Sequence, residues 1–350
     1  MPKVYIIIVN WNGWRDTIEC LESVLRLDYP SFRVIVCDNA SSDSSLDRIA
    51  EWAGGGVASG CSNPDLQHLT SPPCSKPIPF LRTGPGERVA LEARDEKLFL
   101  VQTGSNLGFA GGSNVGLRLA LNAGDFHYAW LLNNDTVVAP QALTSLVRRM
   151  QERPDAGICG SALLYYHDPS LIQAAGGSVF NRWLARGGHI GMLGDAGSLP
   201  PPGEVELKMK YVVGASMLVS RVFLETIGLM SERYFLYFEE IDWATRARGR
   251  YSLAFAPQST VYHKEGRSIG SSADRAKRTP LSEYYGARSR MLFTAQHFPL
   301  GLLGVAIALL GGSLLRFSTG NPSGAGAVLR GLRDAFSRRK AGNSAGRCAW

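Results

Sequence analysis

The sequence predicts an α/β protein with a doubly wound mixed sheet, followed by a C-terminal apolar helical segment. Three observations lead to this prediction. Short β-branched apolar runs alternate with segments of helical periodicity, which is the pattern of a sheet covered by helices. Polar loops follow the apolar runs directly. The chain has 350 residues, 45% of them hydrophobic, which is enough to bury a large core.

The first four elements set the pattern. Residues 4–9 form a β-branched run that ends near the turn dipeptide Asn12-Gly13, as expected for a strand buried on both faces. Apolar residues at helical spacing follow over 16–27, a second buried strand is predicted at 32–37, and a helix runs through 49–52. The short connections favour parallel strand pairing.

Two polar loops follow these strands, at 10–13 and 38–42. In open α/β sheets, ligands bind beyond the carboxyl ends of the strands. We therefore expect the two loops to face one binding crevice.

Residues 53–96 interrupt the alternation. This stretch contains three successive glycines and six prolines, and it shows no sustained periodicity. Such a composition is typical of segments that bury too little apolar surface to order themselves. We interpret 53–96 as a low-complexity, partly disordered insertion, and we expect deletion of about residues 55–94 to leave folding largely intact.

The alternation resumes after the insertion. A strand is predicted at 98–102, a glycine-rich stretch at 106–114, a helix at 115–121 and a buried strand at 128–132, which leads into Asn133. Residues 168–202 show no pattern that would place them. The remaining predicted elements are helices at 140–150, 221–227 and 239–248 and strands at 157–164, 211–213 and 252–256.

The C-terminal part of the chain differs in composition. No residue between Arg290 and Arg316 carries a fixed charge, whereas 316–350 contains seven basic residues and one acid, which is +6 of the total net charge of +7. We divide the chain into a main domain at 1–290, an apolar segment at 291–316 and a basic tail at 317–350. The core of the apolar segment is borderline for a bilayer span, and a membrane-associated or re-entrant hairpin is favoured over a buried core helix.

The six cysteines are scattered without CxxC spacing, which is typical of a reduced cytosolic protein. The N-terminal apolar run is too short for the core of a signal peptide. Because the basic residues concentrate in the tail, the charge indicates a membrane surface or a solvated extension and not a nucleic-acid partner.

Candidate metal ligands follow the buried strand at 128–132, in the sequence Asn133-Asn134-Asp135. Mg²⁺ and Mn²⁺ prefer oxygen ligands and often bind one or two protein carboxylates together with phosphate oxygens. A turn or a helix cap would use the same residues. The motif alone leaves both interpretations open.

A second acidic group comprises Glu239, Glu240 and Asp242, directly after an aromatic run. A carboxylate in an aromatic-lined site suits a general base, whereas acids at a helix N-terminus are also favoured by the helix dipole. His263 alone is more typical of a surface or core residue than of a metal ligand. The glycine-rich stretch 106–114 lacks both the GxGxxG spacing and a P-loop lysine, so it is a weak phosphate signal.

Five motifs occur in order along the chain: Val9-Asn10-Trp11-Asn12-Gly13, Cys37-Asp38-Asn39-Ala40-Ser41, Asn106-Leu107-Gly108-Phe109-Ala110-Gly111-Gly112, Leu132-Asn133-Asn134-Asp135 and Phe238-Glu239-Glu240-Ile241-Asp242. Their joint order is more specific than any of them alone. Together they resemble family 2 inverting glycosyltransferases, and most closely the rhamnosyltransferase-like branch of bacterial polysaccharide synthesis. The resemblance covers about residues 3–295 apart from the insertion.

The resemblance implies a GT-A-like fold and roles for individual residues. Asp135 takes the metal-binding position of the family's DxD motif, Asn133 replaces its first acid, and His263 matches a further metal ligand. Glu240 matches the catalytic base. Nucleotide-sugar contacts are assigned to Asn10, Trp11, Asn12, Asp38, Asn106, Gly108, Asn114, Asn133 and Asn134. The acceptor side is assigned to Gly214, Ala215, Glu239 and Asp242.

The function implied is inverting transfer of a sugar, possibly rhamnose, from a nucleoside-diphosphate donor to a cell-surface polysaccharide or lipid-linked glycan, with Mg²⁺ or Mn²⁺ as cofactor. We expect the protein in the cytoplasm, at or anchored in the inner face of the membrane. A nucleotidyltransferase or a non-catalytic membrane-associated scaffold with this fold are the alternatives. The former should carry a basic, glycine-rich phosphate motif after the first strand, where Asn10-Trp11-Asn12-Gly13 stands instead.

Overall fold

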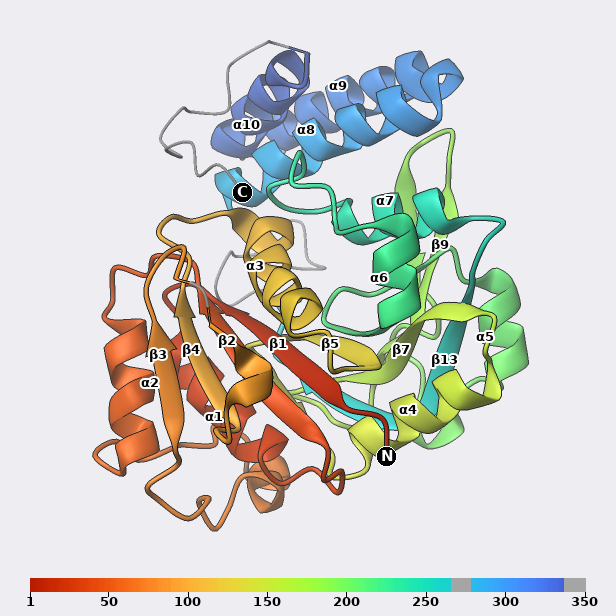
Figure 1. Cartoon of the computed structure of the whole chain (residues 1–350). Coiled ribbons are helices and arrows are strands. Elements are labelled where there is room, and N and C mark those ends of the chain that lie inside the picture. The colour runs from red at the N-terminus through yellow and green to blue at the C-terminus, as the bar shows by residue number, and fades with distance from the viewer. Residues whose placement is uncertain (88, 266–277, 337–350) are drawn as a thin grey trace. The chain divides into compact units, whose positions relative to one another are not determined.

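A computed structural model describes residues 1–87, 89–265 and 278–336 (Figure 1). The chain divides into two compact units. The first comprises residues 1–180, 187–235 and 239–268, and the second comprises 181–186, 236–238 and 269–350. Each unit is described by itself.

A ten-stranded sheet forms the centre of the first unit. Nine strands follow the order β3-β4-β2-β1-β5-β12-β7-β13-β6, and β8 pairs with β7 beside this path. A second sheet has the order β10-β9-β11. The strands are β1 Val4–Asn10, β2 Phe32–Asp38, β3 Phe80–Thr83, β4 Leu98–Gln102, β5 Tyr128–Asn133, β6 Thr136–Val138, β7 Ala156–Tyr165, β8 Ile172–Ala175, β9 Gly177–Asn181, β10 Arg186–His189, β11 Tyr211–Val212, β12 Ser216–Ser220 and β13 Ser252–His263.

Helices cover both faces of the large sheet (Figure 1). Successive side chains of a strand point to opposite faces. Ile6 and Ile8 of β1 therefore pack in one core with α1, α2 and α4, while Tyr5 and Ile7 pack in the other with α3, α6 and α7. The helices of this unit are α1 Trp14–Val24, α2 Ser45–Gly54, α3 Gly108–Ala123, α4 Ala142–Glu152, α5 Pro202–Lys208, α6 Arg221–Ile227 and α7 Glu239–Ala247.

The sheet is mixed, as the sequence predicts. Strand β1 is parallel to both β2 and β5, whereas β12 is antiparallel to β5. The register pairs Asn10 with Asp38 and Val9 with Asn133. Three strands thus end side by side, and their polar terminal residues meet at one edge of the sheet.

The prediction of a partly disordered insertion at 53–96 is wrong for most of that stretch. It contains the 3-10 turns η1, Pro64–Leu69, and η2, Leu91–Ala93, and it supplies β3 as the parallel edge strand beside β4. Leu66, Leu69 and Leu91 are buried. These pieces are too short to show periodicity in the sequence, and they are held by side chains from elsewhere in the chain.

The C-terminal boundaries also differ from the prediction. The boundary at 290 falls inside α8, Pro280–His297, and the apolar segment continues as α9, Leu302–Ser318, after the turn η5, Pro299–Gly301. The predicted basic tail is partly helical, as α10, Pro322–Asp334. The part of the tail at 337–350 lies outside the described residues. Among the described residues, one helical stretch, Pro299–Ser318, is long and apolar enough to cross a membrane.

Candidate functional site

Asp38 and Asn10 hold the ends of β1 and β2 together. Asn10 Nδ2 donates to Asp38 Oδ1 at 2.7 Å, and Thr17 Oγ1 donates to Asn10 Oδ1 at 2.8 Å. The other Asp38 oxygen accepts from the Ser41 N–H at 3.1 Å and from Gln102 Nε2 at 3.0 Å. Both predicted residues are buried. The structure therefore brings them together, with Asp38 fixed by several donors at once.

The neighbouring loops carry the more accessible polar groups. Trp11 is half-buried, and Asn12 is exposed and has a left-handed backbone, φ 51°. Asn12 Oδ1 accepts from the Ser42 N–H at 2.8 Å, which joins the two predicted loops directly. The expectation that the loops after β1 and β2 face one crevice is consistent with this contact.

The glycine-rich stretch forms the start of α3 instead of a separate loop. Asn106 Oδ1 accepts from the Gly108 N–H at 3.0 Å, and Asn39 Nδ2 donates to the Gly108 carbonyl at 2.9 Å. Gly108 has φ 70°, and a Cβ there would lie 2.1 Å from the Phe235 carbonyl oxygen. Only glycine fits both constraints. Asn106 and Gly108 therefore lie beside the loop that follows β2.

Asp135 and His263 meet at the ends of β5 and β13. His263 Nε2 lies 3.2 Å from Asp135 Oδ1 and 3.3 Å from Asn133 Nδ2. Burial favours the neutral imidazole, but the Asp135 carboxylate outweighs it and raises the pKa of His263 above its usual value. Burial likewise opposes the charged carboxylate, but His263 and Lys264 lower the pKa of Asp135. The two side chains form a close buried pair, and each favours the charged form of the other.

The other ring nitrogen of His263 has its own partner. His263 Nδ1 lies 2.9 Å from Oε1 of Gln173, a buried residue on β8. A carbonyl acceptor at Nδ1 fixes the ring so that Nε2 faces Asp135, which is the usual arrangement of a metal-binding histidine. Sequence reasoning missed Gln173, since it belongs to the stretch that showed no pattern.

The donor set of this pair fits a divalent metal that is shared with a substrate. One carboxylate oxygen and one imidazole nitrogen converge within 3.2 Å. No group of three or more His, Cys, Asp or Glu side chains suited to a metal occurs among residues 1–87, 89–265 and 278–336. Sites that bind a metal with diphosphate commonly use few protein ligands. A nitrogen donor suits Mn²⁺ better than Mg²⁺.

The three acids of α7 have different environments. Asp242 is fully buried, and its Oδ2 accepts from Arg246 Nε at 2.8 Å, so the ion pair that helical spacing suggests is present. Glu239 is also buried, whereas Glu240 stays partly accessible. Burial raises the pKa of Glu240, although the backbone N–H groups of Glu240 and Gly214 favour its charged form and oppose the shift.

Gly214 and Ala215 connect the two halves of the site. Gly214 lies against the Glu240 side chain, since a Cβ at Gly214 would be 2.8 Å from Glu240 Oε1, and the Ala215 carbonyl accepts from the Asn133 N–H at 3.0 Å. Consecutive Cα atoms are about 3.8 Å apart. Two adjacent residues thus hold Glu240 on one side and the segment from Asn133 to Asp135 on the other.

The side chains of Asn134 and Asn114 form hydrogen bonds that join neighbouring parts of the chain. Asn134 is buried, and its Nδ2 donates to Thr17 Oγ1 at 3.1 Å, which ties the turn after β5 to α1. Asn114, assigned to the nucleotide-sugar from its motif, is buried and bonded elsewhere: its Nδ2 donates to the Met230 carbonyl and to Glu232 Oε1, each at 2.9 Å. Its amide group therefore holds the loop after α6.

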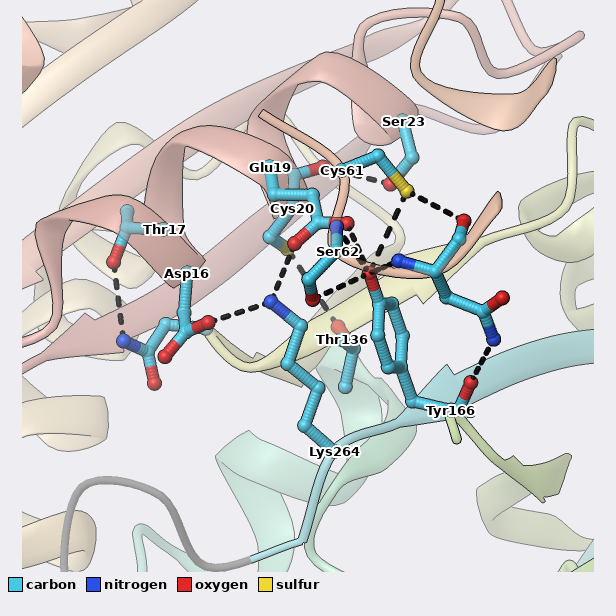
Figure 2. Close-up of polar contacts among 12 residues, drawn as sticks. Asp16, Thr17, Glu19, Cys20, Ser23, Cys61, Ser62, Thr136, Tyr166 and Lys264 are labelled. Atoms are coloured by element: carbon cyan, nitrogen blue, oxygen red, sulfur yellow. Dashed lines mark hydrogen bonds and ion pairs between the residues drawn. The ribbon is translucent and has the colours of Figure 1, made fainter. Parts of the chain in front are cut away.

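A buried polar cluster lies beside the metal-site candidates. Figure 2 shows the Lys264 side chain reaching Asp16 and Glu19 of α1, with Tyr166 next to it. Lys264 Nζ is 2.5 Å from Asp16 Oδ1, and Tyr166 Oη donates to Glu19 Oε1 at 2.6 Å. The Lys264 N–H donates to the Asp135 carbonyl at 3.0 Å. The cluster therefore fixes the end of β13, where His263 lies, against α1.

The insertion is joined to this cluster through Tyr166. The N–H groups of Ser62 and Asn63 donate to Tyr166 Oη at 3.1 and 3.0 Å, and Ser62 and Tyr166 lie together in Figure 2. A second attachment is the buried Glu22 carboxylate, which accepts from the Cys74 N–H at 2.7 Å and from Lys76 Nζ at 3.2 Å. The insertion thus satisfies polar groups that would otherwise be buried without partners.

Deleting residues 55–94 is therefore expected to abolish soluble, folded protein, contrary to the prediction from sequence. The deletion would remove β3 from the edge of β4 and leave Glu22 as a buried charge without its ammonium partner, which is strongly destabilising. Size-exclusion chromatography and thermal melts of the purified variant would measure this. A soluble variant with a native-like transition would contradict the expectation.

A smaller change tests the same attachment. Tyr166→Phe removes the hydroxyl that accepts from the Ser62 and Asn63 N–H groups. The Asn63 donor is buried, and one buried donor without a partner costs about 1–3 kcal/mol. A decrease of roughly 2–5 °C in the unfolding midpoint is expected. Tyr165→Phe, at the adjacent half-buried tyrosine, is the matched control and should leave the midpoint unchanged.

Comparisons with known proteins agree in pointing to glycosyltransferases. The family model described as "Glycosyl transferase family 2" matches residues 5–65 and 87–198, and it omits 66–86 within the insertion. A low-salt glycan biosynthesis hexosyltransferase, Agl10, of Haloferax volcanii is 24% identical over 153 residues, which cover 44% of this chain and 47% of that protein. An N-acetylglucosaminyl-diphospho-decaprenol L-rhamnosyltransferase of Mycobacterium tuberculosis is 26% identical over 193 residues, which cover 49% and 60%.

These matches span about half to three fifths of the length of the two relatives. Among solved structures, GalNAc-T7 with UDP, GalNAc and Mn²⁺ superposes with a TM-score of 0.52 at 13% identity, covering 83% of this chain and 51% of that one. At this identity the likeness concerns the fold alone. It confirms the predicted GT-A-like sheet architecture.

Proposed function

Because the chain belongs to family 2 of the glycosyltransferases, we propose that it transfers one sugar from a nucleoside-diphosphate donor to a hydroxyl of a lipid-linked or cell-surface glycan, with inversion. The observation that supports this most directly is the link through Gly214 and Ala215. It holds Glu240, a partly accessible carboxylate, beside the segment that carries Asp135. The family match disfavours the nucleotidyltransferase and scaffold alternatives.

Glu240 is the general base of this proposal. Its carboxylate accepts the proton of the acceptor hydroxyl as the hydroxyl oxygen forms a bond to the anomeric carbon. The bond from that carbon to the diphosphate oxygen breaks, and the nucleoside diphosphate leaves with the electron pair. A single displacement inverts the configuration. Burial raises the pKa of Glu240, which makes its carboxylate a better proton acceptor near neutral pH.

Asp135 and His263 are proposed to hold a divalent metal, with Asn133 beside them. A bound metal ion would offset the negative charge that develops on the departing diphosphate. Gln173 positions the His263 ring, and the Lys264 cluster positions the backbone of both strand ends. GalNAc-T7, which shares the fold, contains Mn²⁺ in its solved structure. The nitrogen donor supports Mn²⁺ over Mg²⁺.

The donor side is formed by the loops after β1, β2 and β4. We assign nucleotide-sugar contacts to the accessible groups of Trp11, Asn12 and Asn133. The buried Asn10 and Asp38 hold the loops in place through their hydrogen bonds. The name of the mycobacterial relative favours a rhamnosyl donor and a lipid diphosphate acceptor. That relative, together with the exposed apolar helix α9, supports a place at the cytoplasmic face of a membrane.

Release of nucleoside diphosphate tests this proposal. The 350-residue chain would be given thymidine-diphosphate rhamnose and a series of uridine-diphosphate sugars, with an N-acetylglucosaminyl-diphospho-lipid as acceptor and Mn²⁺ present. Acceptor-dependent release with the rhamnosyl donor is the expected result. Release only with a uridine-diphosphate sugar would support glycosyltransferase activity and exclude rhamnose as the transferred sugar. No release with any donor would reject the proposal.

A further inference from the structure

Helix α9 in the second unit exposes an apolar stripe. Its members are Leu303, Ile307, Leu310, Leu314 and Phe317, and four of them are 61–73% exposed. They recur every three or four residues, so at about 100° per residue they fall on one side of the helix. Contiguous exposed apolar surface of this kind is uncommon on a soluble monomer and marks an interaction site.

The opposite side of α9 packs inside its own unit. Val305, Leu309 and Ser313 are buried, and Ser313 Oγ donates to the Ala325 carbonyl of α10 at 3.0 Å. Near the end of α9, Arg316 Nη2 contacts both Glu283 oxygens at 2.8 Å, which joins α9 to α8. One side of α9 is thus fixed by polar and apolar contacts, and the apolar stripe faces away from them.

The tip of the β9–β10 hairpin extends the apolar stripe. Trp183 and Leu184 are 53% and 41% exposed. A Cβ at Gly301 would lie 3.3 Å from the Arg182 carbonyl oxygen, so the tip rests closely on the start of α9. Arg290 Nε of α8 donates to the Leu184 carbonyl at 2.9 Å. The tip is therefore a fixed part of the second unit.

The second unit carries an excess of positive charge among its described residues. The described residues of the second unit contain eight arginines and two acids. Both acids are paired with arginine, Glu283 with Arg316 and Asp334 with Arg333. The eight arginines are Arg182, Arg186, Arg278, Arg288, Arg290, Arg316, Arg330 and Arg333.

We propose that the apolar stripe and the hairpin tip bind the surface of an anionic lipid bilayer, with α9 lying in the plane of the interface. This inference rests on the proposed function only in that a lipid-linked acceptor is found at such a surface. An exposed apolar helix face in a unit with an excess of arginine is the chemistry of interfacial binding. Trp183, with the Arg182 guanidinium 4.9 Å from its ring centre, suits the headgroup level.

A membrane-spanning α9 conflicts with its packing. Pro299–Ser318 has 20 residues, long enough at about 1.5 Å per residue to cross a hydrocarbon core of about 30 Å. However, α10 packs along α9 and carries exposed Arg330 and Arg333. Insertion across the bilayer would take these charges into hydrocarbon or break the unit apart. In-plane binding preserves every contact.

A second copy of the chain suits this surface less well. A two-fold interface would place the same patch of each copy face to face. The excess of arginine would then meet an equal excess, which opposes association. An anionic bilayer instead complements this charge.

Vesicle co-sedimentation of the 350-residue chain tests the inference. Binding is expected to vesicles of phosphatidylcholine with phosphatidylglycerol, and to fall in phosphatidylcholine alone or in high salt. Leu303→Asp/Ile307→Asp should weaken binding by about tenfold or more. The matched control is Leu207→Asp/Val222→Asp in the first unit, where the side chains are 82% and 61% exposed; it should bind like the parent. Equal binding by both pairs would overturn the inference.

Two further measurements complete the test. Tags at the N- and C-terminus should be digested by protease from the same side of sealed vesicles, and protection of either tag would overturn in-plane binding. Light scattering without lipid should give the same mass for the parent and for Leu303→Asp/Ile307→Asp. A parent dimer that this change dissociates would instead assign the surface to a second copy.

Donor hydrolysis in the absence of lipid separates this inference from the proposed function. Leu303→Asp/Ile307→Asp should keep the parent rate of nucleoside diphosphate release, because both residues lie outside the catalytic and metal-binding groups. Loss of vesicle binding with hydrolysis retained supports the surface. Vesicle binding by a chain that releases no nucleoside diphosphate would support the membrane-binding surface and reject the proposed glycosyltransferase activity.

Discussion

Glu240→Gln is expected to lower the transfer rate by about 10²–10⁴-fold, the usual effect of removing a general base. Gln keeps the shape of the side chain and leaves the donor loops unchanged, so the affinity for nucleotide-sugar should stay near that of the parent. The rate constant and the donor affinity are measured separately, by single-turnover transfer and by calorimetric titration.

Asp242→Asn is the comparison that gives this prediction its specificity. Asp242 is buried and paired with Arg246, which also donates to the carbonyls of Ile227 and Leu229. Its neutralisation should lower the unfolding midpoint while leaving measurable transfer in the folded protein. Glu240→Gln should instead leave the unfolding midpoint undiminished and remove most of the transfer activity. The reverse ranking of the two variants, with folded protein in both cases, would reject Glu240 as the base.

The raised pKa of Glu240 has two measurable consequences, one for stability and one for the pH dependence of transfer. A group that holds its proton more tightly in the folded state makes folding less favourable once it is ionised. Glu240→Gln should therefore not lower the unfolding midpoint at neutral pH. The parent's transfer rate should fall as pH decreases through a pKa above the usual glutamate value, and the residual rate of the variant should lose this dependence.

Asp135→Ala is expected to abolish both transfer and the response to Mn²⁺. The change removes the carboxylate that the strand ends place beside His263 Nε2, at 3.2 Å. Mn²⁺ binding in the presence of nucleoside diphosphate, followed by electron paramagnetic resonance of the free ion, gives a readout that does not depend on turnover. Backbone contacts such as that between the Lys264 N–H and the residue-135 carbonyl do not need the side chain, so the protein should fold.

The control for Asp135→Ala is Asp47→Ala, at a largely exposed carboxylate that pairs with Arg82 on the surface. Surface pairs of this kind contribute about 0–1 kcal/mol, so transfer and Mn²⁺ binding should match the parent. Near-normal, metal-dependent transfer by Asp135→Ala would show that the metal site lies elsewhere.

The sequence predicted the buried strands and the main helices well. Strands β1, β2, β4 and β5 are covered on both faces, so each is a continuous apolar run, and helix α6 appears at the predicted residues. Strand β3, with four residues, and strands β8 to β10 were missed. Strands of four or five residues show too few periods to be recognised.

In the candidate site too, contacts between near neighbours in the sequence were predictable and contacts between distant residues were not. On α7, Asp242 and Arg246 are four residues apart and therefore share one face, so helical geometry alone accounts for their ion pair. Nothing local indicated that Gln173 would contact His263, 90 residues away, or that Lys264 would contact Asp16 across 248 positions. Such pairs depend on which strand ends meet.

The sequence by itself determined the features that depend on neighbours along the chain: which segments are strands and helices, which acids share a helix face, and which polar loops succeed strands. The tertiary structure alone decided the features that depend on neighbours in space. The insertion orders because Glu22 and Tyr166 supply partners that its own composition lacks. Helix α9 exposes its apolar stripe because its other side already packs against α10. Composition fixes how apolar a segment is, but only packing decides which of its faces is covered.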